Sequence, residues 1–274
     1  MFESIRRSAH IVKEPKEMRL VMRSDGTVDP AKRVLLVFPI FTHVLPEAFA
    51  AFAHMLLHTG VHLKDYKPDV MVRPRELLHA AMNHAADLCI QNPQYDGLIA
   101  FDDDCLPPPH LVVRMLAHFA HGQHVVAAVG YMRNYPHTTT VGRFLPDGST
   151  LFYNTEKKDI ESRGFEWVDD ISRLTPNEHG LASVDFCGMP AIFMSREVLM
   201  KVEKPAFGHT DRTGAEMTHD IFFCNRVRDA GYTVQVDVTM ECDHIGPSPL
   251  INRETRAWAR AACEHAMAGE RKVG

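Results

Sequence analysis

The stretch Gly97-Leu98-Ile99-Ala100-Phe101-Asp102-Asp103-Asp104 joins an unbroken apolar run to three consecutive carboxylates. A short apolar run of this kind is typical of a strand that is buried on both faces of a parallel sheet. Open α/β sheets bind their ligands just beyond the carboxyl ends of their strands. The stretch therefore predicts an acidic ligand site at that edge of a sheet.

The spacing of the aspartates indicates what such a site would bind. On an extended segment, residues i and i+2 project to the same side, so we expect Asp102 and Asp104 to reach one divalent cation together. Mg²⁺ and Mn²⁺ prefer oxygen ligands of this type and often bridge substrate phosphates. The alternative interpretation is a solvated acidic turn that caps the following helix.

Strand and helix signals alternate on both sides of this stretch. Apolar runs predict strands at 34–38, 69–72, 97–101 and 125–129, and helical periodicity predicts helices at 47–58, from Pro74 to 88 and at 110–121. This alternation predicts a doubly wound, mostly parallel sheet with helices on both faces.

The second half of the chain has a different character. Residues 131–180 are rich in proline and glycine, which predicts two or three antiparallel strands with long loops. Beyond them we expect strands at 184–186, 191–194, 233–238 and 240–244, and helices at 196–202, 218–229 and around Trp258. We find no internal repeat and no low-complexity linker, so we predict a single domain over residues 1–274.

Composition sets broad limits. The chain has 274 residues, of which 45% are hydrophobic, and a net charge of −5, which argues against a protein that coats nucleic acid with its whole surface. The six cysteines are scattered and none has CxxC spacing, which indicates reduced thiols and a cytoplasmic setting. No apolar run is long enough for a membrane span, and no signal peptide is expected.

Two later motifs carry further polar groups. Thr218-His219-Asp220 stands at the start of a predicted helix, and Asp243-His244 ends a late strand. Together with the triple aspartate they provide several carboxylates and an imidazole, which is a common ligand for borderline metals such as Mn²⁺. Asp220 alone is equally consistent with a helix cap, and His244 with a surface histidine.

In the order and context of these motifs, the chain resembles glycosyltransferases of the GT-A fold, close in pattern to the group-2 class, over roughly residues 33–248. The residues 99–104 match the family's hydrophobic strand followed by a DxD motif, and 75–83 match the helix that bears an arginine and an asparagine. Cys187 to Ala191 match the glycine-bearing acceptor segment. His219-Asp220 stands where the family usually has Glu-Asp, and His244 matches the histidine ligand.

The resemblance implies a GT-A fold, with a nucleotide-sugar-binding half at 33–130, an acceptor-side half with a small antiparallel sheet at 131–248, and a C-terminal helix at 249–274. It implies a metal-dependent enzyme that moves a sugar from a nucleoside-diphosphate sugar, by family frequency a UDP-sugar, to a hydroxyl. The implied residues are Asp102, Asp104 and His244 for Mn²⁺ or Mg²⁺; Pro39, Phe41, Thr42, Arg75, Asp102 and Asp103 for the donor; Asp220 as general base; and Asp185, Gly188 and His219 for the acceptor.

Several alternatives stay open at this point. The His-Asp pair in place of Glu-Asp leaves inverting and retaining mechanisms both possible, and Arg75 and Asp185 also suit structural roles. The acceptor is either a hydroxymethylated pyrimidine in DNA, as in related phage-encoded enzymes, or a glycan or protein. Basic residues that would suit a DNA backbone lie at both ends of the chain and at Arg133, His137, Arg143, Lys157, Lys158 and Arg163. Rival classes are a metal-dependent nucleotidyltransferase or phosphohydrolase, and an inactive sugar-nucleotide-binding module.

Overall fold

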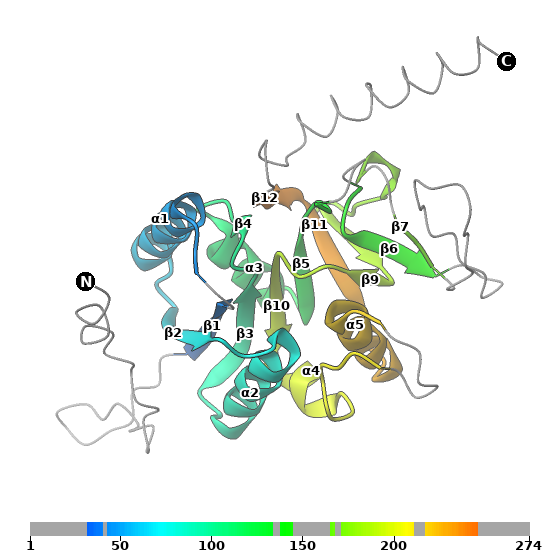
Figure 1. Cartoon of the computed structure of the whole chain (residues 1–274), viewed down its shortest axis with the longest axis horizontal. Coiled ribbons are helices and arrows are strands. Elements are labelled where there is room, and N and C mark those ends of the chain that lie inside the picture. The colour runs from blue at the N-terminus through cyan, green and yellow to red at the C-terminus, as the bar shows by residue number, and fades with distance from the viewer. Residues whose placement is uncertain are drawn as a thin grey trace, which may run out of the picture. The chain divides into compact units, whose positions relative to one another are not determined.

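The computed structural model describes residues 32–40, 43–133, 138–144, 165–167, 171–210 and 217–245. These residues all belong to one compact unit that begins at Lys32 (Figure 1). The predicted single domain over 1–274 stays a prediction, and the predicted C-terminal helix at 249–274 lies outside the described residues. In the described part of the chain, no helix combines the length and apolar character needed to cross a membrane.

A seven-stranded sheet forms the centre of this unit. Its strands are β1 (Lys32–Ile40), β2 (Tyr66–Pro74), β3 (Tyr95–Phe101), β5 (Val125–Val129), β8 (Leu181–Val184), β10 (Ala191–Ser195) and β11 (Val234–Glu241). They lie in the order β2-β1-β3-β10-β5-β11-β8. The strands β10 and β8 run antiparallel to their neighbours, and the other five run in one direction. The predicted mostly parallel sheet is therefore confirmed.

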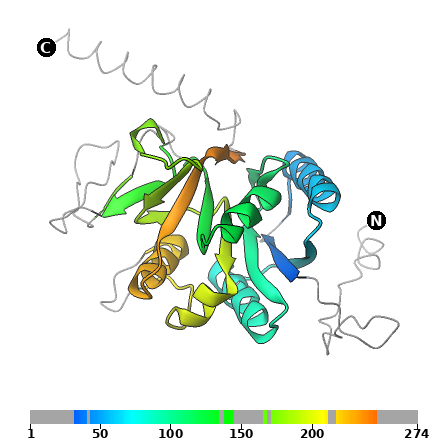
Figure 2. The same cartoon turned by 180° about the vertical axis from the view of Figure 1, so that it is seen from behind.

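Helices cover both faces of this sheet (Figures 1 and 2). The helices α1 (Pro46–His62) and α3 (Leu111–Ala120) share one apolar core with Leu36 and Ile99, whereas α2 (Leu78–Gln91), α4 (Arg196–Lys201) and α5 (His219–Asp229) share the other with Leu35 and Leu98. Successive residues of a strand point to opposite faces. Because both faces are covered, the middle positions of the inner strands β1, β3, β5 and β10 are buried, which explains the continuous apolar runs in the sequence.

Three features differ from the sequence-based expectation. Pro74 does not open a helix but ends β2, an edge strand where a missing N–H breaks no essential ladder, and α2 begins only at Leu78. The strand β10 is inserted antiparallel between β3 and β5. The two late strands expected at 233–238 and 240–244 are instead one long strand, β11, and a short one, β12 (Asp243–His244).

Two small sheets accompany the central one. The strands β6 (Val141–Phe144), β7 (Phe165–Trp167) and β9 (Phe186–Cys187) form an antiparallel sheet, which confirms the small second sheet expected in this half of the chain, and a short 3₁₀ helix, η2 (Ile171–Arg173), follows β7. The strand β4 (Cys105–Leu106) pairs antiparallel with β12. This second pairing joins the segment after β3 to the segment after β11.

A buried carboxylate ties β11 to α3. Asp237 has no solvent exposure and accepts hydrogen bonds from Arg114 Nε, from His118 Nε2 at 2.7 Å and from Thr239 Oγ1 at 2.7 Å. Burial disfavours the charge, but the hydrogen bonds from His118, Arg114 and Thr239 outweigh it and hold the pKa of Asp237 below its usual range. The network fixes the sheet beneath the carboxyl end of β11.

Candidate active site

The triple aspartate lies in a turn. The strand β3 ends at Phe101, and the Cys105 N–H donates to the Asp102 carbonyl at 3.4 Å, so the chain reverses at once into β4. The Asp102 N–H donates to the Pro190 carbonyl at 3.2 Å, which anchors the start of the turn. The expectation of an extended segment at Asp102 to Asp104 is therefore wrong, because the chain must turn back for β4 to pair with β12.

The pairing of β4 with β12 brings Asp104 and His244 together. Cys105 lies opposite His244 in the ladder, and the Ile245 N–H donates to the Asp104 carbonyl at 2.9 Å. The Asp104 Oδ2 and His244 Nε2 atoms are 3.3 Å apart, and both side chains are largely shielded from solvent. Two motifs far apart in the sequence thus meet at the carboxyl edge of the sheet, as expected.

Hydrogen bonding fixes the tautomer of His244. Its Nδ1 lies 2.7 Å from the Tyr131 carbonyl oxygen, so Nδ1 carries the proton and donates it. Nε2 then presents a lone pair, and Arg133 Nε donates to it at 2.9 Å. Burial lowers the pKa of His244, and the charge of Arg133 lowers it further, while the Tyr131 contact opposes this. A neutral imidazole whose second nitrogen is held by a carbonyl is the usual arrangement of a metal-ligating histidine.

The donor set at this point suits a hard or borderline cation. Among the residues that the structure describes, Asp104, Cys105 and His244 form the one group whose potential ligand atoms all lie within 4.8 Å of one another. Burial raises the pKa of the Cys105 thiol, which keeps it protonated and a weak ligand. A carboxylate oxygen and an imidazole nitrogen remain, and this pair fits Mn²⁺. Asp102 lies outside this group.

A cavity of about 310 Å³ opens over these groups. It is lined by Pro39, Glu76, Leu78, Asp102, Asp103, Asp104, Arg133 and His244. Four of the lining residues are acidic, whereas Arg133 is the one lining residue with a permanent positive charge. Such an excess of carboxylates in a hollow favours the binding of a cation.

Asp220 lies close enough to Asp102 to affect its ionisation. Burial raises the pKa of Asp102 to about 7, with further contributions from the charges of Asp220 and Asp103, which Arg133 partly offsets. The Asp220 Oδ1 also accepts the Ile221 N–H at 2.9 Å, so this carboxylate caps α5 as well. Carboxylates with strongly perturbed pKa values in a cavity are frequent at functional sites.

Gly188 is required by close packing near this edge. A Cβ atom at this position would lie 2.6 Å from the Thr140 Cβ, and the Gly188 N–H donates to the Thr140 carbonyl at 2.5 Å. Two residues later, Pro190 accepts the hydrogen bond from Asp102. The glycine-bearing segment thus borders the cavity, and its glycine also has a structural reason.

His219 belongs to a group of three histidines. It is the first residue of α5, and its ring lies 6.5 Å from the ring of His209, which in turn lies 4.2 Å from the ring of His79. Burial lowers the pKa of His219, the charge of Asp220 opposes this, and the neighbouring His209 and His79 lower the pKa further. His219 is next to Asp220 in the sequence, and both side chains are partly buried at the beginning of α5.

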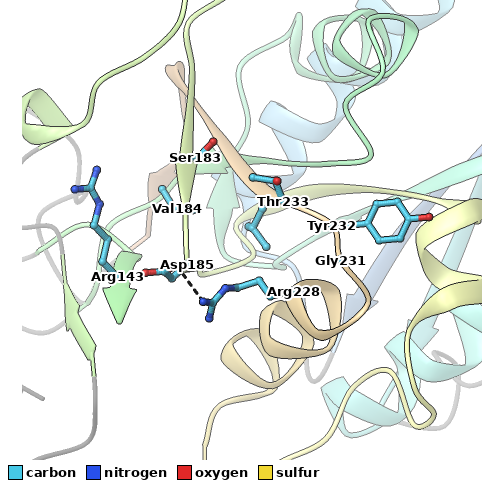
Figure 3. A pocket seen from close by; sticks show the side chains of 9 residues that line it. Arg143, Ser183, Val184, Asp185, Arg228, Gly231, Tyr232 and Thr233 are labelled. Carbon is cyan, nitrogen blue, oxygen red and sulfur yellow. Dashed lines mark ion pairs between the residues drawn. The ribbon is translucent and has the colours of Figure 1, made fainter. Parts of the chain in front are cut away.

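Asp185 lies away from the other predicted residues. It lines a second cavity of about 460 Å³ together with Arg143 and Arg228, and its Oδ1 is 3.4 Å from an Arg228 nitrogen (Figure 3). Val184 pairs with Val234 at the beginning of β11, which is the opposite edge of the sheet from Asp102. Because a helix rises 1.5 Å per residue, Arg228 lies about 12 Å along α5 from Asp220. The structure does not bring Asp185 to the first cavity.

The residues predicted to bind the donor near the end of β1 and after β2 do not all lie at the cavity. Pro39 lines the first cavity, and Phe41 and Thr42 lie outside the described residues. Arg75 forms the turn between β2 and α2 with a left-handed φ of 58°, which is uncommon for a residue other than glycine, and its N–H donates to the Ile40 carbonyl at 2.9 Å. Arg75 is exposed and does not line the cavity.

Three site residues were not predicted as such. The sequence marks Arg133 only as a basic residue, and neither Glu76 nor Tyr131 belongs to a site motif of its own. Tyr131 acts through its backbone carbonyl, which leaves no signature in the residue type. Glu76 lines the cavity and directly follows Arg75. Its place in the arginine-bearing motif at 75–83 is the one sequence feature that could have indicated it as a site residue.

Comparison with known proteins supports the fold and no more. No family model and no curated protein matches the sequence. Among solved structures, A197 from STIV is similar with a TM-score of 0.50 and 20% identity, over 78% of this chain and 85% of that one. A Drosophila β-1,4-galactosyltransferase 7 mutant in complex with manganese, UDP-Gal and xylobiose has a TM-score of 0.36 and 15% identity, over 75% and 65% of the two chains. A putative glucose-1-phosphate thymidylyltransferase from Bacillus anthracis has a TM-score of 0.40 and 8% identity, over 78% and 89%.

The mostly parallel seven-stranded sheet with helices on both faces agrees with the predicted α/β architecture of the GT-A type, and A197 is similar in fold. At 20% identity this likeness concerns fold alone. The predicted GT-A-like α/β architecture is thus confirmed, and any activity must be argued from the residues of the cavity.

Proposed function

We propose that the protein is a metal-dependent glycosyltransferase, which moves a sugar from a nucleoside-diphosphate sugar to a hydroxyl group. The observation that carries this proposal is the Asp104–His244 pair, with 3.3 Å between Oδ2 and Nε2, in an acidic cavity at the carboxyl edge of a GT-A-like sheet. Ligand sites of open α/β sheets form at this edge.

In this proposal Asp104 and His244 hold Mn²⁺ or Mg²⁺, and Asp102 and Asp103 face the donor from the same cavity. When bound, the cation supplies positive charge that neutralises the departing diphosphate. The Tyr131 carbonyl keeps the His244 Nε2 lone pair available for this role. The neutral thiol of Cys105 fills space behind the ligands.

The donor lies between the cation and the end of β1. Pro39 lines the cavity there, and we assign the nucleoside to this segment together with Phe41 and Thr42. UDP is the proposed carrier, on the strength of the family resemblance. Arg75 stands on the turn beside the Ile40 carbonyl and would reach the diphosphate with its side chain, because its planar fork matches phosphate oxygens.

Asp220 is the proposed general base. Its carboxylate takes the proton of the acceptor hydroxyl while that oxygen attacks the anomeric carbon, and the bond from the sugar to the diphosphate breaks. The influence of Asp220 on the ionisation of Asp102 supports its position beside the donor. Gly188 lies two residues before Pro190, whose carbonyl contacts Asp102, and His219 is next to Asp220 in the sequence; both are proposed to contact the acceptor. Asp185 would serve only an acceptor long enough to reach the second cavity.

For the acceptor, we propose a hydroxymethylated pyrimidine in DNA, with a polysaccharide or protein hydroxyl as the second candidate. Arg143 is an exposed basic side chain of the described residues that would suit a phosphate backbone. The target base would have to leave the stack to enter the cavity. A gel-shift series with modified and unmodified DNA at increasing salt tests this, since absent or salt-independent binding excludes DNA.

The reaction class is tested by incubating the protein with several UDP-sugars and Mn²⁺. Release of nucleoside diphosphate, abolished in a folded Asp104→Asn variant, is the expected result. Release of inorganic phosphate or pyrophosphate would instead indicate a phosphohydrolase or nucleotidyltransferase. Tight binding without turnover under all conditions, acceptors included, would indicate an inactive sugar-nucleotide-binding module.

A further inference from the structure

Arg133 contacts both groups of the proposed cation site. Its terminal nitrogen forms an ion pair with Asp104 Oδ2, and its Nε donates to His244 Nε2 at 2.9 Å. These are the two atoms to which the cation would bind. His244 Nε2 has a single lone pair, so a guanidinium and a divalent ion cannot both bind to it.

We infer that Arg133 is a tethered cation that competes with the metal and is released when the nucleotide arrives. The inference rests on the proposed function and adds an order of binding to it. In the free protein the guanidinium satisfies Asp104 and His244. In the complex the metal takes these two ligands, and the diphosphate offers the displaced guanidinium a bidentate partner.

The surroundings of Arg133 fit this exchange. Its side chain is 54% exposed, whereas those of Asp104 and His244 are 19% and 16% exposed. The two ligands are thus held in place by the β4–β12 pair, while the arginine reaches in from the solvent side. Met132, the preceding residue, is fixed by its N–H bond to the Thr138 carbonyl at 2.9 Å. Only the long side chain of Arg133 has to move for the metal to enter.

The competition has a measurable size. An exposed arginine–carboxylate pair contributes up to about 1 kcal/mol, which corresponds to about a fivefold change in an equilibrium constant. Removing Arg133 should therefore tighten the binding of Mn²⁺ to the nucleotide-free protein by up to about fivefold. With UDP present, Arg133 binds the diphosphate. Removing Arg133 should then weaken the binding of Mn²⁺, or at least not tighten it relative to the wild type.

The experiment titrates Mn²⁺ into the full chain and follows free Mn²⁺ by electron paramagnetic resonance, with and without UDP. The variants are Arg133→Ala and, as a matched control, Arg143→Ala, which removes the same charge from an exposed arginine that lines the second cavity. We expect tighter nucleotide-free binding in Arg133→Ala alone, and loss of that advantage with UDP.

Equal Mn²⁺ affinity of wild type and Arg133→Ala would overturn the inference and leave the proposed metal site intact. An equal gain in Arg143→Ala would also overturn it, because the effect would then reflect net charge. If Mn²⁺ binds to neither the wild type nor Arg133→Ala, with or without UDP, the proposed metal site itself is wrong and the inference falls with it.

Discussion

Replacing Asp102 with asparagine should stabilise the metal-free protein, and more so at neutral and alkaline pH than at acid pH. Burial and the neighbouring acids Asp220 and Asp103 raise the pKa of Asp102 from an ordinary 3.8 to about 7. At about 1.36 kcal/mol per pKa unit, this difference corresponds to about 4 kcal/mol. Because the side chain keeps some contact with solvent, we expect about half of that, ~2 kcal/mol.

The sign follows from proton linkage. The folded state binds the Asp102 proton more tightly than the unfolded state, so this group makes the protein less stable as pH rises from about 4 to about 7, after which its effect is constant. Asparagine does not titrate in this range. The gain from Asp102→Asn should therefore be full at about pH 8 and smaller at about pH 5.

Urea unfolding followed by circular dichroism, in buffer with a chelator, measures this gain at both pH values. Asp87→Asn is the control, since that side chain is 59% exposed on α2, and it should change stability little at either pH. If Asp102→Asn is destabilising, or if its effect is the same at both pH values, the carboxylate is not held in an unfavourable acidic cavity and the reasoning is refuted.

Three further outcomes are expected. Asp237→Asn should cost about 1.5–3 kcal/mol in urea unfolding, because Arg114 and His118 lose their charged hydrogen-bond acceptor; a loss under 1 kcal/mol would contradict this. Gly188→Ala should cost about 1–3 kcal/mol, because its methyl group would press on the Thr140 side chain, and an unchanged melting temperature would show that this segment yields easily. Asp220→Asn should lower the turnover of UDP-sugar by about 10²–10⁴-fold with little change in donor affinity, and a loss of thermal stability alone would favour the capping role.

Much of the fold could be predicted because its strands are buried on both faces. The run at 97–101 and the alternation of helices around it indicate covered parallel strands, and the structure has them. The direction of β10 could not be predicted in the same way. A strand buried on both faces, such as Ala191–Ser195, has the same sequence pattern whether it runs parallel or antiparallel to β3.

The candidate site was partly predictable for a related reason. Asp104 and His244 each follow a strand, and strand ends of one direction gather at one edge. Their contact depends on the two-residue strands β4 and β12, which are too short to leave a periodic signal. Asp185 also follows a strand, but β8 runs antiparallel to β11. The carboxyl end of β8 therefore lies at the opposite edge of the sheet from Asp104 and His244.

The arginine at the metal position has no sequence signal at all. Arg133 precedes no recognisable motif, and the hydrogen bond between His244 Nδ1 and the Tyr131 carbonyl brings its segment to β12. Its role depends on a contact between segments that are far apart in the chain.

The central claim is tested most directly by a crystal of the protein soaked with Mn²⁺ and UDP, with anomalous scattering recorded for manganese. The account predicts a manganese peak bonded to Asp104 Oδ2 and His244 Nε2, with the Arg133 guanidinium moved onto the diphosphate. A manganese peak elsewhere, or none while UDP is bound and Arg133 still contacts both ligands, would contradict it.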